Sequence, residues 1–495
     1  MIGDLPDLIA RRAALTPGKV ALENVATGRT QTYKELDARA GQVAALLAAR
    51  GIGEGDRVAA LSRNRIEFFE LLFGCAKLGA ILVPLNWRMP PAELAGSVGD
   101  AEPALLFHGA AEAAATAKLG VPTIDFDGDY EALLATAPTC SLRDRWPAGA
   151  IWYLLYTSGT TGRPKGVIYT YRMALANHIN IGGAIGLTGA DTTASFLPIF
   201  HTAGINLHAL PTLIAGGRVI VMDGFDADAL VTLLEARRLD TVFAVPTVYQ
   251  SLLDHPRFAL APLGAVRHWG CGGAPLPDAL ALRYRELGVR VCNGMGMTET
   301  GPTAFLVDAA DAWDRLGSVG KPQLLCSARI VGPDGREAAD GEVGDLHFAG
   351  PGVTPGYWRN DEATRAAFAD DGWLISGDLA RRDADGFFWI AGRRKEMFIS
   401  GGENVYPAEV ENVLAAHPAV VDAAVLAEAD PKWGEVGRAF VQLAPASGRP
   451  DDAELAAFCR ARLAAYKVPR RFHFVAEFPR TSAGKIQKHL LVSRP

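Results

Sequence analysis

Apolar and polar residues are arranged along the first two-thirds of the chain in a pattern that predicts strands followed by helices. The short apolar runs 56–61, 217–222 and 240–245 predict buried strands, and each precedes a segment whose apolar residues recur at helical spacing. The third of these helices begins with Pro246, a residue suited to a first helical turn. This alternation predicts parallel sheets covered by helices.

The pattern changes in the last third of the chain. Short apolar strands are separated there by turn sequences such as PDG, DDG and DADG, which predicts a β-rich module over 317–393. After a glycine-and-charge segment at 393–396, strands and helices resume, with a helix that begins near Pro407. We therefore predict an α/β protein with a large N-terminal domain at 1–394 and a small α+β C-terminal domain at 395–495.

Composition excludes several classes of protein. The 495 residues are 49% hydrophobic, enough for large cores, and the net charge of -6 provides no basic field for nucleic acid or an anionic membrane. Six cysteines lie far apart without a CxxC pair, which disfavours a disulfide framework or a cysteine metal site. The N-terminus lacks the apolar core of a signal peptide, and Lys77 interrupts the most apolar stretch, 71–85. We expect a cytoplasmic protein without a membrane span.

The candidate chemistry begins in a loop rich in glycine and hydroxyl residues, with the sequence YTSGTTGRPKG at 156–166. Glycines let backbone N–H groups converge on phosphate oxygens, a helix after the loop would add its positive end, and Lys165 adds a mobile charge. The loop is not a Walker loop, because two residues separate Gly162 from Lys165 and no Ser or Thr follows the lysine. The nucleotide-binding residues expected here are Thr157, Ser158, Gly159, Thr160, Thr161, Gly162 and Lys165.

This loop resembles the signature loop of the adenylate-forming superfamily, which includes acyl-CoA synthetases, firefly luciferase and the adenylation domains of peptide synthetases. Further stretches resemble that family's motifs in the family's order, so the resemblance covers nearly the whole chain. They are PIFHTAG (198–204), CGGAP (271–275), GMTETG (296–301), GYW (356–358), SGDLA (376–380), GRRKEMFISGGENVYPAEVE (392–411) and PRTSAGKI (479–486). The resemblance implies a two-step reaction. A carboxylate attacks the α-phosphorus of ATP to give an acyl-adenylate and pyrophosphate, and a thiol then displaces AMP.

The resemblance implies a role in adenylation for five residues. Lys485 matches the lysine that bridges carboxylate and phosphate oxygens, in a step that depends chiefly on positioning and charge neutralisation. Glu299 would hold Mg²⁺, which takes oxygen ligands, and Thr298 would hold a phosphate oxygen. Asp378 resembles the carboxylate that accepts hydrogen bonds from both ribose hydroxyls, with Arg393 as its companion. Without the family match, the same residues would be a surface lysine, a capped helix start, a turn and a surface arginine.

The adenine contacts implied by the resemblance include one departure from the family. Gly273 and Ala274 would form a wall of small residues against adenine. Most relatives carry an aromatic residue before G-M-T-E, where this chain has Met295, so a thioether replaces a stacking ring. The other residues expected at the nucleotide are Asn293, Gly294, Gly296 and Met297.

The resemblance also implies a moving C-terminal domain and a site for coenzyme A. Lys395 aligns with the family hinge, where the mobile domain swings from an adenylating pose, which presents Lys485, to a thioester-forming pose. The second pose presents Gly401 and Gly402 beside the pantetheine tunnel, where missing side chains make room. Trp433 is interpreted either as a contact to coenzyme A or as a packing residue.

The acyl group is expected in an apolar slot. His201 resembles the aromatic gate between this slot and ATP, and it stands where amino-acid-activating relatives carry an aspartate, which favours a substrate without an α-amine. No cationic residue is obvious among the slot candidates, which argues against dicarboxylic acids. The expected slot residues are His201, Phe243, Val245, Thr247, Val248, Gly270, Gly272 and Met297.

These residues distinguish between three possible functions. The favoured one is an acyl-CoA synthetase of the fatty-acyl or feruloyl type, which uses ATP, Mg²⁺ and coenzyme A on a fatty or aromatic acid. A stand-alone adenylation enzyme that loads a carrier protein in trans is the alternative. A nucleotide sensor without turnover would be expected to have lost Lys485 or Glu299, and both are present. The predicted partners are small molecules and not nucleic acid, and the sequence is compatible with a homodimer.

Overall fold

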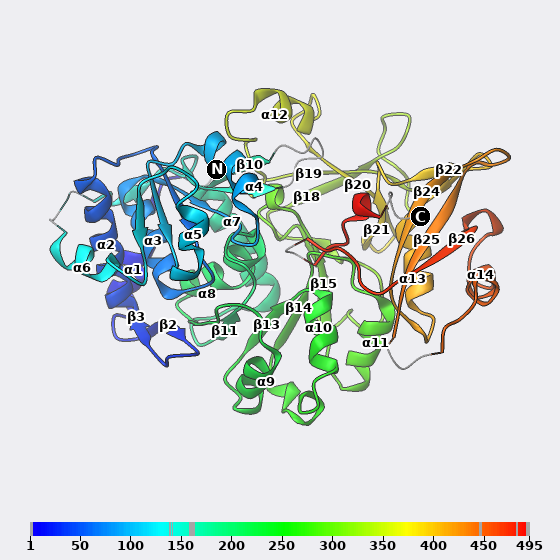
Figure 1. Cartoon of the computed structure of the whole chain (residues 1–495), viewed down its shortest axis with the longest axis horizontal. Helices are drawn as coiled ribbons and strands as arrows, with labels where there is room; N and C mark the ends of the chain where they lie inside the picture. Colours follow the sequence, from blue (N-terminus) through cyan, green and yellow to red (C-terminus); the bar gives the residue numbers. More distant parts are fainter. Residues whose placement is uncertain are drawn as a thin grey trace.

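The structure is a computed structural model that describes residues 3–137, 140, 142–157, 164–444, 448–481 and 484–491. Within these residues the strands form five sheets. The blue N-terminal part of the chain lies on the left of Figure 1 and the orange C-terminal part on the right. The α/β class predicted from the alternating pattern is confirmed.

The largest sheet has nine strands and lies at the centre of the molecule. Its middle strands pair in parallel, and a helix follows most of them, as the alternation of apolar runs predicts. In sheet order the strands are β17 (Lys321–Pro322), β16 (Phe305–Leu306), β15 (Val291–Met295), β14 (His268–Cys271), β13 (Thr241–Ala244), β11 (Thr192–Ser195), β12 (Arg218–Val221), β2 (Val20–Asn24) and β3 (Thr30–Thr32).

A second sheet of six strands fills the N-terminal part. It contains the predicted strand at 56–61, and another of its strands carries the fully buried Trp152 and Tyr153. In sheet order the strands are β10 (Lys165–Thr170), β9 (Ile151–Thr157), β5 (Ile81–Pro84), β4 (Arg57–Leu61), β6 (Leu105–His108) and β7 (Thr123–Asp125). A two-stranded ribbon, β1 (Leu5–Pro6) with β8 (Arg145–Trp146), lies beside it.

Two smaller sheets form the last third of the chain. The β-rich pattern becomes an antiparallel meander, whose four strands are β18 (Ser327–Val331), β19 (Gly344–Ala349), β20 (Leu374–Arg382) and β21 (Phe388–Arg393). The C-terminal sheet has its own hydrophobic core with α13 and α14, and its strands are β22 (Phe398–Ser400), β23 (Glu403–Val405), β24 (Val420–Asp430), β25 (Gly434–Leu443) and β26 (Arg471–Val475).

Helices cover these sheets, and local sequence sets several of their ends. Thr32 and Glu35 form a capping box at the start of the second helix, and Gly79, at φ 87°, ends the third. The α-helices are α1 (Leu8–Leu15), α2 (Tyr33–Ala49), α3 (Ile66–Leu78), α4 (Pro91–Ala101), α5 (Ala113–Thr116), α6 (Tyr130–Thr136), α7 (Tyr171–Ile185), α8 (Ala209–Ala215), α9 (Ala227–Glu235), α10 (Pro246–Leu253), α11 (Asp278–Glu286), α12 (Asp361–Ala367), α13 (Pro407–Ala415) and α14 (Asp452–Arg460).

One expectation about the glycine-rich loop is wrong. The segment after the loop is strand β10 and not a helix, and Lys165 at its first position pairs with Thr157 at the end of β9. The loop therefore connects two antiparallel strands, because the apolar run VIY after Lys165 continues the six-stranded sheet. No helix N-terminus directly follows the loop to attract a phosphate.

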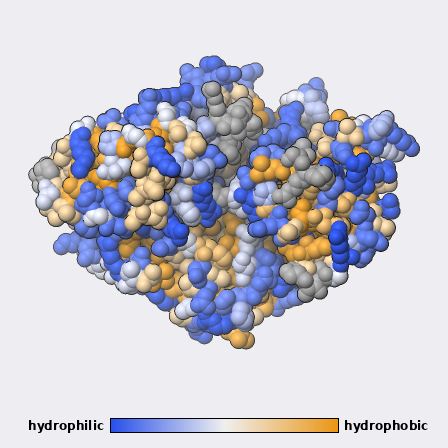
Figure 2. All heavy atoms as spheres, in the orientation of Figure 1, coloured by the Kyte–Doolittle hydropathy of each residue, from blue (hydrophilic) through white to orange (hydrophobic). Residues whose placement is uncertain are grey.

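Hydrophilic residues are spread over the whole face shown in Figure 2, with hydrophobic ones interspersed among them. Among the described residues, no helix is long and apolar enough to cross a bilayer.

Candidate functional site

The segment that carries Lys485 is a short turn against the N-terminal part of the chain. Arg480 pairs with Ile486 across the turn, and the Lys485 backbone N–H donates to the Thr481 hydroxyl at 3.1 Å. A Cβ at Gly484 would lie 3.3 Å from the Thr247 Oγ1 atom, so the turn contacts the beginning of α10. A residue near the end of the chain therefore meets one from its middle at this point.

Lys485 lies in an electrostatically crowded position. Its side chain remains in contact with solvent, but the surrounding protein desolvates the amine and, with the charge of Arg393, lowers the Lys485 pKa. The carboxylates of Asp378, Glu299 and Glu396 oppose this shift. The structure thus brings the predicted catalytic lysine to the predicted ribose and metal residues.

The predicted ribose pair lies on neighbouring strands. Asp378 on β20 is directly opposite Arg393 on β21, and the Arg393 Nε atom is 2.7 Å from the Asp378 carboxylate. Burial raises the pKa of Asp378, and the nearby charges of Arg393 and Lys485 counteract that rise. The guanidinium thereby favours the ionised, acceptor-only form that a ribose diol requires.

Glu299 lies beside two residues from other motifs. Tyr357 forms an antiparallel β-bridge with Val167 of β10, and its hydroxyl donates to the Glu299 Oε1 atom at 3.0 Å. The Lys165 Nζ atom lies 5.2 Å from the centre of the Tyr357 ring. Burial, followed by the charge of Glu299, raises the pKa of Tyr357, which keeps the phenol protonated as a donor. Motifs far apart in sequence therefore converge on one buried carboxylate.

Glu299 fits a magnesium ion that is held together with a nucleotide. No group of three or more His, Cys, Asp or Glu side chains suited to a metal occurs among the described residues. Mg²⁺ commonly takes one or two carboxylates and completes its shell with phosphates and water. A single carboxylate that follows Thr298 in the chain, and that bonds to a tyrosine whose ring Lys165 also contacts, is compatible with that mode of binding.

The small residues near the expected adenine position are required by close packing. A Cβ at Gly296 would lie 1.4 Å from the Pro302 carbonyl oxygen, and Gly273 adopts a positive φ of 83°. Gly273 lies against Val245, and Ala274 follows it directly. Gly273, predicted to contact adenine, and Val245, predicted to contact the acyl group, are therefore neighbours.

The strand before the MTE motif holds three further nucleotide candidates. The Asn293 side chain donates to the Ser318 carbonyl oxygen at 2.8 Å, and Gly294 lies against Phe305. Met295 is half-buried, lies opposite Phe305 and packs against the core of the four-stranded sheet. Met297 and Thr298 follow at a one-turn 3₁₀ helix, in which Thr298 is buried.

The residues predicted for coenzyme A lie in a separate hairpin. Gly401 and Gly402 form the two-residue turn between β22 and β23, with positive φ angles of 61° and 90°. A Cβ at Gly401 would lie 2.6 Å from the Trp433 ring, and one at Gly402 would meet nothing within 4 Å. The tryptophan therefore packs on the first glycine, and both glycines are exposed. The structure does not bring them to the Lys485 cluster.

The predicted hinge residue lies in an exposed turn between two sheets. Lys395 follows β21 and precedes β22, and the Met397 N–H donates to the Arg393 carbonyl oxygen across the turn. Within the part of the chain that the structure describes, the Lys395 N–H donates no backbone hydrogen bond. A residue there can change its backbone angles without breaking a strand.

His201 lies close enough to Lys485 for the charge of the lysine to act on its imidazole. Burial, together with the charge of Lys485, lowers the pKa of His201 to about 4, so the imidazole is neutral at pH 7. Phe243 packs against both Gly270 and Gly272, because a Cβ on either glycine would meet its ring within 3.2 Å. Val248 packs instead in the core around Tyr249 and Leu252.

Sequence reasoning missed three residues that the structure places beside the candidates. These are Tyr357, which bonds to Glu299, and two buried histidines, His208 and His268, which lie beside Phe243 and Gly270. The motif GYW marked Tyr357, but its hydrogen-bond partner lies 58 residues away. Ser158, Gly159, Thr160, Thr161 and Gly162 lie outside the described residues.

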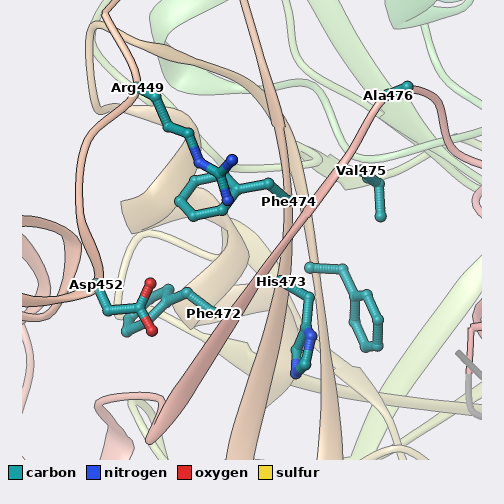
Figure 3. Close-up of a pocket in the computed structure, with 8 residues that line it drawn as sticks. Arg449, Asp452, Phe472, His473, Phe474, Val475 and Ala476 are labelled. Atoms are coloured by element: carbon teal, nitrogen blue, oxygen red, sulfur yellow. The ribbon is translucent and has the colours of Figure 1, made fainter. Parts of the chain in front are cut away.

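A hollow of about 440 Å³ on the C-terminal sheet is a separate feature (Figure 3). The Arg449 guanidinium lies over the Phe474 ring at 4.3 Å, and His473 stacks on Phe440. None of the residues predicted for ATP, the acid or coenzyme A lines this hollow.

Comparison with known proteins agrees with this geometry. Residues 9–358 match the family described as AMP-binding enzyme, and residues 409–485 match the AMP-binding enzyme C-terminal domain. A feruloyl-CoA synthase from Amycolatopsis sp. is 40% identical, with 97% of this chain and 96% of that protein covered. An indoleacetate–CoA ligase from Aromatoleum aromaticum is 36% identical, with 98% and 97% covered.

Solved structures give the same result. The o-succinylbenzoate CoA synthetase from Bacillus subtilis, in complex with its acyl-adenylate intermediate, superposes with a TM-score of 0.90 at 32% identity, with 100% of this chain and 99% of that one covered. The same synthetase has been solved with ATP and a magnesium ion.

The chain belongs to the AMP-binding, adenylate-forming enzyme family. It is an ATP-dependent, AMP-forming acid–CoA ligase. The relatives' names contain different acids, so the family leaves the acid open, and nothing in the comparisons supports the homodimer.

Proposed function

We propose that this ligase adenylates an apolar carboxylic acid, fatty or aromatic, and passes the acyl group to coenzyme A. The observation that carries the adenylation step is the position of Lys485 among Asp378, Arg393 and Glu299. An ammonium there lies beside the groups expected to hold ribose and magnesium, where it can neutralise the carboxylate and phosphate oxygens as they approach.

Each residue then has a defined task. Asp378 and Arg393 hold the ribose, Glu299 holds the magnesium ion that supplies charge neutralisation to the phosphates, and Lys165 contributes a second cation. His201 stays neutral at the entrance to the acyl slot, where an uncharged ring does not compete with the lysine for the carboxylate. Thioester formation needs the Gly401–Gly402 hairpin, which is exposed in the present pose and available after a hinge rotation at Lys395.

A screen of pyrophosphate release tests this proposal. Aliphatic, cinnamic, benzoic and ring-containing acids should be compared with ATP, with and without coenzyme A. Acid-dependent pyrophosphate release, followed by AMP and acyl-CoA only when coenzyme A is present, supports the proposal. Thioester formation on a carrier protein but not on coenzyme A would instead support the alternative enzyme.

The rate of pyrophosphate release should decline on the alkaline side at a pH below 10.5, the pKa of an ordinary lysine. Desolvation and Arg393 lower the Lys485 pKa from 10.5, and the neutral amine above that pKa can no longer bridge two anions. The pH dependence of kcat measures this. Whatever activity Lys485→Arg retains should lack the alkaline decline, because a guanidinium stays charged throughout. A wild-type rate that is flat up to pH 10.5 would contradict the assignment.

Met295→Tyr should lower the Kd for ATP severalfold. Stacking of a base on an aromatic ring is worth about 1–3 kcal/mol and a methionine–ring contact about 0.3–1.5 kcal/mol, so the gain is on the order of 1 kcal/mol. Calorimetric titration with ATP measures the effect, and the affinity for the acid should hardly change. Unchanged or weaker ATP binding by a folded variant would show that Met295 serves only the packing around Phe305.

A further inference from the structure

Two buried histidines lie next to each other beside Phe243 and Gly270, two residues predicted for the acyl slot. His208 follows a π-helical turn at Ala203–Leu207 and precedes α8, and His268 is the first residue of β14. Their ring centres are 6.1 Å apart. The Nε2 atom of each is buried and has no hydrogen-bond partner among the described residues. Buried polar atoms are rarely left unpaired, so this pair needs an explanation.

The neighbours of His208 occupy its Nδ1 atom and leave its Nε2 atom open. The Nδ1 atom lies 3.3 Å from the hydroxyl oxygens of both Thr193 and Thr241. The Thr193 hydroxyl donates its single hydrogen to the Thr241 carbonyl oxygen, so towards Nδ1 it can only accept, whereas the Thr241 hydroxyl can donate to Nδ1 or accept from it. In both arrangements Nδ1 is satisfied and the buried Nε2 atom of His208 is left without a partner, as a lone pair or as an N–H.

His268 connects this pair to the acyl slot. Its Nε2 atom lies 3.0 Å from the place where a Cβ at Gly270 would be, and the Phe243 ring lies 2.8 Å from the same point. The Phe243 ring also meets His208 edge-on, at 5.6 Å between ring centres, and it covers Gly272. His208, His268 and the predicted acyl residues Gly270 and Gly272 therefore all lie around the Phe243 ring.

The surroundings make this end of the slot polar but uncharged. Burial lowers the pKa of His208 to about 3 and that of His268 to about 4, so both rings are neutral at pH 7. The nearest arginine, Arg267, lies 2.8 Å from Asp191 and also donates to the Ile185 carbonyl oxygen. A second carboxylate on the substrate would therefore find its closest cation already paired, and an alkyl end would leave the imidazole nitrogens unpaired.

We propose that His208 and His268 form the distal end of the acid-binding slot and bind a hydroxyl group at the end of the substrate opposite its carboxylate. The substrate class is then a hydroxyaryl acid, whose ring packs beside Phe243 and whose hydroxyl group, which can both donate and accept, hydrogen-bonds to the His208 Nε2 atom. This proposal rests on the proposed function and narrows it. It makes both histidines specificity-determining residues and excludes simple alkyl acids as preferred substrates.

The test compares acids that differ only at the distal position. The kcat/KM for pyrophosphate release is measured with 4-hydroxycinnamate, 4-methylcinnamate, cinnamate and octanoate in the wild type, His208→Leu and His268→Leu. The wild type should favour 4-hydroxycinnamate over 4-methylcinnamate by about tenfold or more, because a pocket that leaves polar atoms unpaired rejects the apolar analogue. His208→Leu should bring this ratio to about one or below, and His208→Gln should keep part of it.

Matched controls separate specificity from stability. His473→Leu makes the same change at another imidazole with an unpartnered Nε2 atom, in the C-terminal sheet, and it should leave the ratio unchanged. The KM for ATP should be the same in all variants. If His208→Leu fails to fold, His268→Leu and the wild-type ratio still decide the question.

Two results would overturn the inference. They are a wild type that does not favour the hydroxylated acid over its methyl analogue, and folded variants of His208 and His268 that keep the wild-type ratio. If no acid of any class supports pyrophosphate release, the proposed function itself fails. The two failures are therefore distinguishable.

Discussion

Lys485→Ala should reduce adenylate formation by about 10²–10³-fold, the usual cost of removing one preorganised group that stabilises charge in a transition state. The side chain lies among the charges of Asp378, Arg393 and Glu299. Acid-dependent pyrophosphate release measures the loss. The KM values for ATP and acid should change less than kcat, because the ammonium acts mainly as charge develops.

The second half-reaction provides the internal control for this variant. A supplied acyl-adenylate should still be converted to acyl-CoA, since the proposed thioester-forming pose uses the Gly401–Gly402 hairpin instead of the lysine. Lys118→Ala, at an exposed lysine, controls for the loss of a positive charge elsewhere. A folded Lys485→Ala variant that loses both half-reactions in equal proportion would show that the lysine is not specific to adenylation.

The sequence predicted most of the fold because the strands that build it are locally encoded. The runs at 56–61, 217–222 and 240–245 became β4, β12 and β13 with small changes at their ends. They are apolar on both faces, as strands buried between helices must be. The wrong expectation, a helix after the glycine-rich loop, arose because a loop of this composition commonly precedes a helix. Here the residues after Lys165 pair with β9 instead.

The missed residues depend on contacts that no local pattern encodes. Tyr357 reaches Glu299 only because Val167 on β10 pairs with it across the chain. His208, at the start of α8, and His268, at the start of β14, become neighbours because both elements lie beside Phe243. In the sequence, neither histidine can be told from one that is buried for packing alone. Family resemblance supplied Lys485, Glu299 and Asp378, but it could not supply residues that distinguish one member from another.

Lys395→Pro should keep adenylation and lose thioester formation. The present pose needs no change at this turn, because the Lys395 N–H donates no backbone hydrogen bond within the described chain and the side chain is exposed. Proline therefore removes no observed bond, but it fixes φ and restricts the proposed rotation of the C-terminal sheet to a second pose. Pyrophosphate release should stay near the wild-type rate, and acyl-CoA formation from acyl-adenylate should fall at least about 10²-fold, the cost of even a 1 Å misplacement.

Lys395→Ala separates the two ways in which proline could act. Alanine removes the same side chain but keeps φ free, so it should form acyl-CoA at nearly the wild-type rate. Both half-reactions are measured on each variant, with acyl-adenylate supplied for the second, and thermal unfolding checks that the fold is intact. Equal loss in the alanine and proline variants would assign the role to the ammonium group instead of to rotation. A normal rate of acyl-CoA formation in Lys395→Pro would show that the chain pivots elsewhere, because a backbone with φ fixed at this residue cannot also supply the swing.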